Sequence, residues 1–362
     1  MRIAIVDPAS WSLAYDAPLG AALTRAGCDV TLHCTRSPHG ASVMDHADEL
    51  RVEESFYRSG YGLGFLPRRI GRAVQHPLDL AKLVRRLRQE ADAVLVQWLP
   101  GRGVDATAWA RLATDMPVTF TAHNAQERDE TLDPALLRGF TAVIAHSDGG
   151  VQALRDAGLE AVWRMTIGAY TQYATSADPS ELPVSLEPNA PLVVLPGILR
   201  DYKGVDILLE AWPAVAAAVP GARCVIAGRP MDVVLPTSPP EGMTILPRFV
   251  SEDELGWLLR SATVCCLPYR QIDMSGIAAS ALACGTPLVL SDVGGFGEYV
   301  GRGATLVPPN DPTALAAELI RVLADPALRE RLAAEARIAT DTVYSWDGIA
   351  ATYVQLLSTL VD

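Results

Sequence analysis

The chain has 362 residues, of which 49% are hydrophobic and 20% charged, and its formal net charge is −12. This length fits two domains of ordinary size, and this composition excludes a largely disordered chain. An acidic chain without a strong basic stripe is a poor partner for nucleic acid, and no apolar run is long enough to span a bilayer.

Short apolar strands alternate with helices from the first residues. The start, MRIAIVDPAS, reads as a buried strand and not as a signal peptide, so we predict a cytoplasmic protein. Helices are predicted at Leu19–Ala26 and Val151–Ala157, each followed by a glycine that suits a left-handed stop. The predicted strands are mostly β-branched and cover Ile3–Val6, Val30–His33, Ala93–Gln97, Val118–Thr121 and Ala142–Ala145. This order predicts a doubly wound α/β sheet of parallel strands.

The alternation stops between Tyr170 and Pro191, a stretch of Pro, Ser and Ala without a period that we interpret as a linker. It then resumes, with strands predicted at Leu192–Leu195, Cys224–Ala227, Met243–Leu246, Val264–Leu267 and Leu288–Leu290. The chain is therefore predicted to form two α/β halves. Ligands of open α/β sheets bind beyond the carboxyl ends of the strands. With two such sheets facing each other, the cleft between them is the predicted site.

The six cysteines do not form a metal-binding pattern. None lies in a C-x-x-C pair, and no histidine lies at zinc-finger spacing. We interpret them as small core residues of a reduced protein and predict no metal site. They are Cys28, Cys34, Cys224, Cys265, Cys266 and Cys284.

The segment LPGILRDYKGVDILLEAW places two cations between a strand and a helix. The strand ends at Gly197, the loop carries Arg200 and Lys203, and Gly204 precedes the helix. Two cations at such a turn suit a polyanion such as a diphosphate. The alternative is that both are solvated surface charges.

The segment DMSGIAASALACGTPLVLSDVGGFGE contains a second candidate site for phosphate. Ser275 is predicted to cap the helix that follows, and Gly276 would let a ligand approach the backbone closely. The free N–H groups of this helix start would attract phosphate. After the next strand come Gly294, Gly295 and Glu298. The alternative is that the small residues serve only tight packing against the sheet.

Three features of the first half are candidates for sugar or acceptor binding. His123 and Asn124 lie just past a predicted strand, where we predict a role at a sugar, the alternative being a structural hydrogen bond. The aromatic residues Trp11, Tyr15 and Trp98 would either stack on an acceptor or belong to the core.

The third feature, residues 65–88, is a basic amphipathic stretch. It suggests a weak peripheral contact with anionic lipid at the inner membrane face. An ordinary surface helix is the alternative that we favour.

Several motifs resemble the family-4 glycosyltransferases, a retaining group with the GT-B fold. The donor half of that family is similar to residues 192–350 through GILRDYKGVDILLEA, SALACGTPLVLSDVGGFGE and LVPPNDPTALAAEL. In the first half the likeness is carried by TAHN, AHSDGGVQAL and MTIGAY, and SWDGIAATYVQLL resembles the closing helix that crosses back to the first domain.

The resemblance implies two Rossmann-like doubly wound domains facing a central cleft. Residues 1–172, with the closing helix 347–362, would bind the acceptor, and residues 190–345 would bind the nucleotide sugar.

The resemblance also implies roles for individual residues. Lys203 matches the diphosphate-binding lysine, whereas Arg200 lies near the family's arginine position, which falls at Ile198. His123 matches a residue that contacts sugar hydroxyls. The remaining matches are Ser275 and Gly276 in the phosphate loop, Arg248, Phe249 and Val250 beside the nucleobase, and Gly294 and Gly295 in the turn before Glu298. Gly197, at the strand end before Arg200 and Lys203, is predicted to bind the donor with them.

One departure concerns the ribose. The family's two glutamates, eight positions apart, fall here at Ile272 and Ser280, with Asp273 one place from the first. The second glutamate normally holds the ribose, so Ser280 would replace it with an uncharged hydroxyl. The nature of the donor nucleotide is therefore open.

We predict a metal-independent hexosyltransferase without a cofactor, acting from a nucleoside-diphosphate sugar on a sugar, lipid or small-molecule acceptor. A sugar-nucleotide epimerase is an alternative, with Asp273, Glu298 and His123 as its acid and base candidates. A two-lobed solute-binding protein is another, but such proteins are normally exported and joined by more crossings of the chain.

Overall fold

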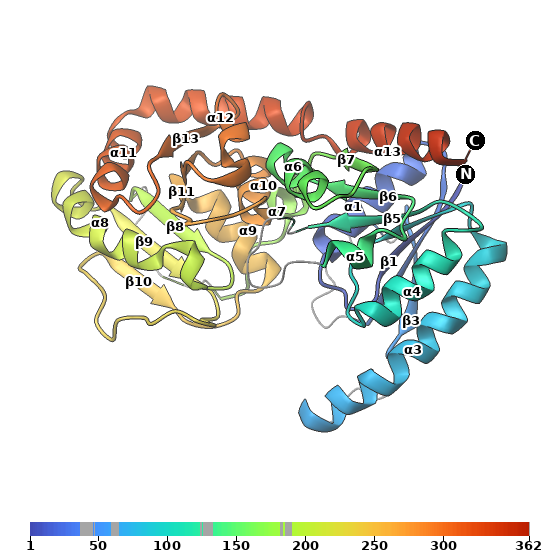
Figure 1. The fold of residues 1–362 in the computed structure, drawn as a ribbon. Helices are drawn as coiled ribbons and strands as arrows, with labels where there is room; N and C mark the ends of the chain where they lie inside the picture. The colour runs from blue at the N-terminus through green and yellow to red at the C-terminus, as the bar shows by residue number, and fades with distance from the viewer. Residues whose placement is uncertain are drawn as a thin grey trace. The chain divides into compact units, whose positions relative to one another are not determined.

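The computed structural model describes residues 1–36, 46, 48–58, 65–123, 125, 133–181, 184 and 190–361, and of these only the backbone at 65–70. The chain forms two compact units (Figure 1). Unit 1 consists of Met1–Gly168 and Trp346–Asp362, and unit 2 of Ala169–Ser345.

Unit 1 is built on a seven-stranded parallel sheet with the order β3-β2-β1-β4-β5-β6-β7. Its strands are β1 (Arg2–Asp7), β2 (Asp29–Thr35), β3 (Arg51–Phe56), β4 (Ala93–Val96), β5 (Val118–Ala122), β6 (Ala142–Ala145) and β7 (Val162–Arg164). Its helices are α1 (Leu13–Arg25), α3 (Phe65–Glu90), α4 (Gly103–Leu112), α5 (Pro134–Leu137), α6 (Asp148–Asp156) and α13 (Trp346–Val361).

All five strands predicted in the first half are confirmed, whereas the two edge strands β3 and β7 were missed. The central strands are buried on both faces and therefore read as continuous apolar runs. Strand β3 has the sequence RVEESF and is only partly buried, and β7 has three residues. Charged or short edge strands protect a sheet from pairing with other chains, but they remove the apolar signal.

Helix α3 carries the basic stretch noted in the sequence. Leu80, Leu83 and Leu87 bury one face of the helix in the core beneath the sheet. On the other face, Arg86 forms ion pairs with Glu53 and Glu90, and Arg88 pairs with Asp115. The first part of the stretch, 65–70, lies outside the described side chains. No described helix combines the length and the apolar character that crossing a bilayer needs.

Helix α13 packs on α1 within unit 1. The hydroxyl groups of Tyr353 and Tyr15 lie 2.7 Å apart, and both side chains are buried. Arg25 donates to the Asp347 carboxylate at 2.7 Å. Tyr353 and Leu357, which the sequence placed on an apolar face of this helix, are buried as expected.

Unit 2 is built on a six-stranded parallel sheet with the order β10-β9-β8-β11-β12-β13. Its strands are β8 (Leu192–Pro196), β9 (Arg223–Ala227), β10 (Met243–Leu246), β11 (Val264–Leu267), β12 (Leu288–Ser291) and β13 (Ala304–Val307). Its α-helices are α7 (Gln172–Thr175), α8 (Val205–Ala218), α9 (Glu252–Ser261), α10 (Gly276–Ala283), α11 (Pro312–Ala324) and α12 (Pro326–Asp341), and two 3₁₀ helices are η1 (Asp201–Lys203) and η2 (Gly294–Tyr299).

The first part of the predicted linker belongs to unit 2 and is ordered against α9. The Arg260 guanidinium donates to the Tyr173 carbonyl oxygen at 2.6 Å, to Ser176 at 2.8 Å and to Asp178 at 2.7 Å. The contact division between the units therefore falls after Gly168, ahead of the segment that the sequence suggested. The part of the linker at 182–183 and 185–189 lies outside the described residues.

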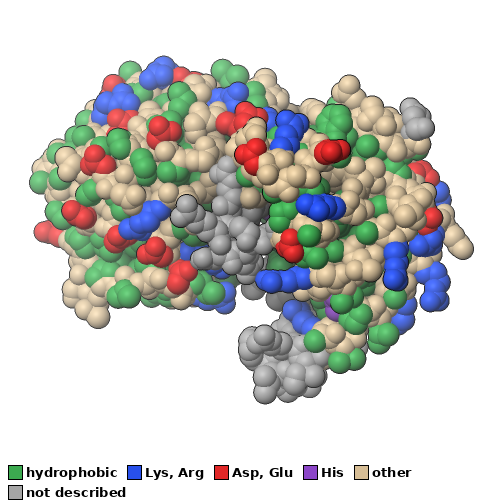
Figure 2. All heavy atoms as spheres, viewed as in Figure 1, with side chains coloured by type: hydrophobic (Ala, Val, Ile, Leu, Met, Phe, Trp, Pro, Cys, Tyr) green, Lys and Arg blue, Asp and Glu red, His purple; other side chains and the backbone are tan. Residues whose placement is uncertain are grey.

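Acidic and basic side chains are interspersed over the unit 2 surface drawn in Figure 2.

In both sheets the strand order reverses once, between β1 and β4 in unit 1 and between β8 and β11 in unit 2. Such a reversal leaves a crevice at the carboxyl ends of the two strands, where ligands of doubly wound sheets bind.

All six cysteines are free, and five are buried, which agrees with their interpretation as core residues.

Candidate functional site

Two loops of unit 2 leave the sheet at its reversal point and touch each other. The loop after β8 contains Gly197 and Gly204, and the loop after β11 begins at Pro268. A Cβ atom at Gly204 would overlap the Pro268 carbonyl oxygen, and one at Gly228, after β9, would overlap the Gly197 carbonyl oxygen. These glycines have positive φ values of 65° and 156°. Only glycine combines this backbone conformation with so close an approach.

Lys203 is a buried cation at this point. Its side chain lies at the end of η1, the residue is 6% exposed, and Nζ lies 5.2 Å from the centre of the Tyr269 ring. Within the described part of the chain Lys203 has no ion pair. Burial, with a contribution from the charge of Arg200, lowers the pKa of Lys203 to about 8. A buried charge without a partner lowers the stability of the protein. An anionic ligand would supply the negative charge that Lys203 lacks.

Helix α10 begins beside Lys203. The Ser275 hydroxyl accepts a hydrogen bond from the Ala278 N–H at 3.3 Å, which makes Ser275 the predicted N-cap. A Cβ built on Gly197 would lie 2.9 Å from Lys203 Nζ and 3.3 Å from the Ile277 side chain. The ammonium group and the first turn of α10 therefore flank the same glycine. The two features that the sequence assigned to phosphate binding lie next to each other.

Gly276 packs against an aromatic side chain of its own unit. The space where its side chain would be is occupied by Tyr170, whose ring lies 3.0 Å from an added Cβ. The absence of a side chain therefore accommodates an aromatic ring of the same unit, whereas the sequence had suggested close approach of a ligand.

Ser280, which its position assigned to the ribose, has a hydrogen-bond partner within its own helix. Its hydroxyl donates to the Gly276 carbonyl oxygen at 2.7 Å, and the residue is 1% exposed. A serine in a helix commonly satisfies itself in this way. The motif gave the position of Ser280 in the chain, but not this partner of its side chain.

The loop after β12 clamps the loop before α10. The Gly295 N–H donates to the Asp273 carbonyl oxygen at 3.1 Å, and a Cβ at Gly294 would overlap the Ile272 carbonyl oxygen. Asp273 is 1% exposed, so its carboxylate is inside the protein. Glu298 is half-buried in η2, and its carbonyl oxygen accepts from Arg302 at 2.8 Å. These contacts hold the Ile272–Ser275 segment in place.

The three residues predicted beside the nucleobase lie between β10 and α9. The Arg248 guanidinium donates to the Glu254 carboxylate at 2.6 Å, and Glu254 in turn forms a capping box with Ser251. Arg248 is thus engaged in fixing the start of α9. Phe249 is 49% exposed and Val250 is half-buried. Arg200 has an exposed side chain at the start of η1.

In unit 1, His123 belongs to a chain of hydrogen-bonded side chains beyond the carboxyl end of β5. Its Nε2 lies 3.0 Å from Gln97 Oε1, and its Nδ1 lies 3.2 Å from His146 Nε2. His146 Nδ1 lies 2.9 Å from the Met165 carbonyl oxygen. The Trp98 ring stacks on the His123 ring at 5.0 Å. His146 was not selected from the sequence as a candidate site residue. Its position directly after a buried strand could have indicated it. Asn124 lies outside the described residues.

These contacts fix the protonation of the two histidines. A carbonyl oxygen only accepts, so His146 carries its proton on Nδ1 and accepts on Nε2. His123 then donates from Nδ1 and accepts on Nε2. This orientation requires the Gln97 amide to present its nitrogen to His123. The Gln97 nitrogen is otherwise buried without a partner. Burial, with a smaller effect of His146, holds the pKa of His123 well below its usual range.

We expect His123 to stay neutral between pH 6.5 and about 8, because burial disfavours its charged form. Imidazole ¹⁵N NMR should show a proton on Nδ1 of His123 and no titration in that range. His146→Asn removes one partner and assigns the signals. A His123 resonance that titrates near the ordinary value of 6.5 would contradict the arrangement.

The aromatic residues predicted for the acceptor separate into two kinds. Tyr15 is 1% exposed and bonds to Tyr353, so it belongs to the core and does not stack on a ligand. Trp11 is 63% exposed and lies edge-on to Trp98, whose Nε1 donates to the Ser12 hydroxyl at 2.9 Å. Only the two tryptophans present an accessible ring. Among the described residues no cluster of three His, Cys, Asp or Glu side chains has the geometry of a metal site.

Comparisons with known proteins cover both units. A family model described as "Glycosyltransferase Family 4" matches residues 18–166, and one described as "Glycosyl transferases group 1" matches residues 190–325. Glycogen synthase of Mycobacterium tuberculosis is 34% identical over 44% of this chain and 40% of its own length. A D-inositol 3-phosphate glycosyltransferase of Xylanimonas cellulosilytica is 27% identical over 72% of this chain and 69% of its own length. The chain thus spans about 40% of the glycogen synthase.

Solved structures extend the likeness to the whole fold. Alr3699/HepE of Anabaena, solved in complex with UDP-glucose, has a TM-score of 0.72 at 16% identity over 99% of this chain and 100% of its own. Sucrose-phosphate synthase from Thermosynechococcus elongatus has a TM-score of 0.68 at 20% identity over 99% of both chains. Together with the two parallel sheets, these likenesses establish the GT-B fold.

Proposed function

The chain belongs to the family-4 glycosyltransferases, and from this membership we propose that it transfers a hexose from a nucleoside-diphosphate sugar to an acceptor hydroxyl, with retention of the anomeric configuration. Unit 2 binds the donor and unit 1 the acceptor. A structural neighbour that binds UDP-glucose supports a nucleotide-sugar donor.

The observation that carries this proposal is Lys203. It is a buried cation, it has no acidic partner in the described part of the chain, and it lies beside the start of α10. A diphosphate would satisfy the ammonium group and the free N–H groups of the helix together. Gly197 keeps the space between the two open.

The chemistry follows from where charge develops. The bond between the anomeric carbon and the diphosphate oxygen breaks, and the acceptor oxygen forms the new bond to that carbon. The acceptor proton passes to the leaving phosphate. Lys203, Arg200 and the positive end of α10 stabilise the negative charge on the diphosphate, which is usually the largest catalytic contribution. These groups do so without a metal ion.

Two other functions remain distinguishable by product analysis. An epimerase of the same fold would change the donor sugar without an acceptor, and a solute-binding protein would release no nucleotide. Transfer of the sugar to an acceptor, or its slow hydrolysis with release of the nucleoside diphosphate, separates the proposed function from both. The comparisons with glycosyltransferases do not favour either alternative.

Nucleotide binding should depend on pH in a way that reports Lys203. The free protein loses the Lys203 charge as pH rises through about 8, whereas a bound diphosphate keeps the lysine protonated. Affinity for UDP and GDP, measured by titration calorimetry, should therefore be highest at neutral pH and fall above about pH 8, with uptake of a proton on binding. Lys203→Met is the control and should remove the pH dependence. Absence of binding to every nucleoside diphosphate would refute the donor assignment.

A further inference from the structure

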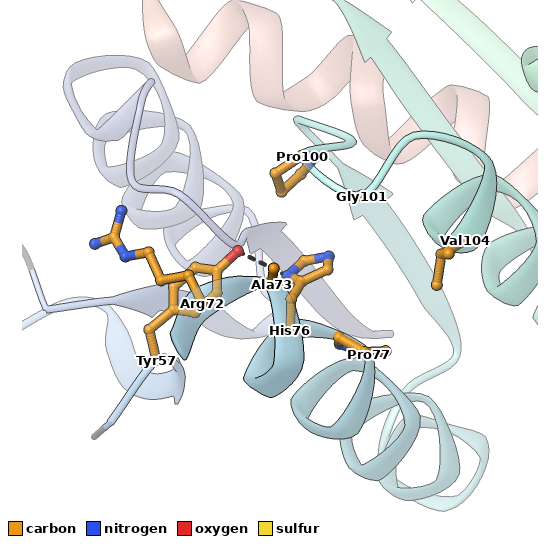
Figure 3. A pocket seen from close by; sticks show the side chains of 8 residues that line it. All are labelled: Tyr57, Arg72, Ala73, His76, Pro77, Pro100, Gly101 and Val104. Atoms are coloured by element: carbon orange, nitrogen blue, oxygen red, sulfur yellow. Dashed lines mark hydrogen bonds between the residues drawn. The ribbon is translucent and has the colours of Figure 1, made fainter. Parts of the chain in front are cut away.

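A cavity of about 300 Å³ in unit 1 lies apart from the residues discussed so far (Figure 3). It lies between the first half of α3 and the loop that leads into α4. Tyr57, just after β3, and His76 on α3 form one side, and Pro100 and Val104 the other. The carboxyl ends of β3 and β4 bring these residues to the ligand-binding edge of the sheet.

The side chains at its base form a continuous chain of hydrogen bonds. Asp105 is fully buried; its Oδ2 accepts from the Gly101 N–H at 2.8 Å, and its Oδ1 lies 2.6 Å from His76 Nε2. With a neutral ring, His76 donates from Nε2 and accepts on Nδ1, where the Tyr57 hydroxyl donates at 2.7 Å (Figure 3). The orientation of every member is thus fixed.

Gly101 completes the base because a side chain there would collide with this chain. An added Cβ would lie 2.5 Å from Asp105 Oδ1 and 2.9 Å from the His76 ring. The backbone on both sides of the cavity is strained: Tyr57 has a φ of 54° and Arg102 a φ of 44°. Such values are uncommon outside glycine and persist where surrounding contacts enforce them. The Tyr57 N–H is held by Asp79 at 2.9 Å.

Arg72 is the cation of the cavity wall, and its charge is not neutralised there. Its guanidinium lies over the Tyr57 ring, 4.8 Å from the ring centre, and it forms no ion pair with any described residue. Two carboxylates of this region already have partners, because Asp105 holds His76 and Gly101, and Asp79 holds Tyr57. A guanidinium stacked on a ring still has its N–H groups along the edge, where they can bind an anion in a forked manner.

The rest of the wall is apolar and open to solvent. Val104 is 55% exposed, and Pro77 and Ala73 of α3 are also exposed. On the same helix Val74 is 63% and Leu78 58% exposed. In Figure 3, His76 lies between Arg72 and Val104. The cavity therefore has apolar side chains around His76, and the Arg72 guanidinium lies at its rim, across the Tyr57 ring.

We propose that this cavity binds an organic anion, a phosphate or carboxylate group carried on an apolar ring or chain. Arg72 pairs with the anionic group, and the Pro77, Pro100 and Val104 surfaces cover the apolar body. The Asp105–His76–Tyr57 chain holds the base rigid. If the chain is a glycosyltransferase as proposed above, this ligand is part of the acceptor, and the acceptor is then an amphipathic acid.

The experiment is calorimetric titration with three probes: phenyl phosphate, inorganic phosphate and benzyl alcohol. Phenyl phosphate should bind, and the other two should bind at least about tenfold more weakly, because each lacks one of the two recognised groups. Arg72→Gln should weaken phenyl phosphate by about tenfold or more. The matched control is Arg111→Gln, an exposed arginine on α4, which should leave binding unchanged.

Each other outcome would overturn the proposal. Equal binding of inorganic phosphate would mean a bare anion site, and equal binding of benzyl alcohol would mean an apolar pocket that does not read charge. Unchanged binding in Arg72→Gln would place the ligand elsewhere. UDP binding, measured on the same variant, separates this proposal from the donor assignment: Arg72→Gln should bind UDP like the parent protein. If the parent protein bound no nucleoside diphosphate at all, the donor site would be refuted and the cavity result would still stand.

Discussion

Replacing Lys203 with methionine is expected to lower sugar transfer or donor hydrolysis by about 100-fold or more. Methionine fills a similar volume but removes the positive charge that the structure buries beside the start of α10. The negative charge that develops on the leaving diphosphate would then lose its closest cation. The rate is measured as release of the nucleoside diphosphate from its sugar, and nucleotide affinity by titration calorimetry. Lys82→Met, at the other and exposed lysine of the chain, is the control.

The same substitution should stabilise the free protein, which excludes misfolding as the cause of lost activity. The pKa of Lys203 is lowered from 10.5 to about 8, so at neutral pH the folded state holds an unfavourable charge. This penalty is largest below about pH 8 and fades as pH rises toward 10.5, where the unfolded chain also loses its proton. Its upper bound is roughly 3 kcal/mol. A Lys203→Met protein that melts at a higher temperature and yet transfers sugar at the parent rate would refute the role.

Most of the strands that the sequence predicted are buried along nearly their whole length, because burial leaves a run of apolar residues that can be read directly. Strand β10, with three half-buried positions, is the exception. The missed strand β13 has two half-buried positions, and β3 carries two glutamates, so neither shows such a run. The division between the units, after Gly168, falls ahead of the predicted linker for a related reason. Tyr173 and Ser176 are ordered by Arg260, a residue more than 80 positions away, and no local pattern records that contact.

The candidate site shows the same division. The proximity of Lys203 and Ser275 was predictable, because both follow adjacent strands at the point where the sheet order reverses. The engagement of Ser280 with Gly276 and of Arg248 with Glu254 was not, since a motif gives the position of a side chain and not its partner. The Asp105–His76–Tyr57 chain was missed because its members come from three separate elements.

Gly294→Ala is expected to destabilise unit 2 by roughly 3 kcal/mol or more, because two costs add. The residue has a φ of 50°, a conformation that costs any side chain about 1–2 kcal/mol, and its new Cβ would overlap the Ile272 carbonyl oxygen. Gly301→Ala separates the two costs, since Gly301 has a φ of 72° but nothing within 4 Å of an added Cβ. The control should therefore lose only about 1 kcal/mol. Urea unfolding of both variants measures the difference.

The consequence for the site follows from what Gly294 supports. The clash would push the Ile272–Asp273 backbone away from Gly295, and Ser275, the cap of α10, lies two residues further along the chain. Nucleotide affinity should therefore fall in Gly294→Ala and stay unchanged in Gly301→Ala, even at temperatures where both are fully folded. If both variants unfold at the same urea concentration, the two loops are not in the contact described, and the start of α10 does not depend on that contact for its position.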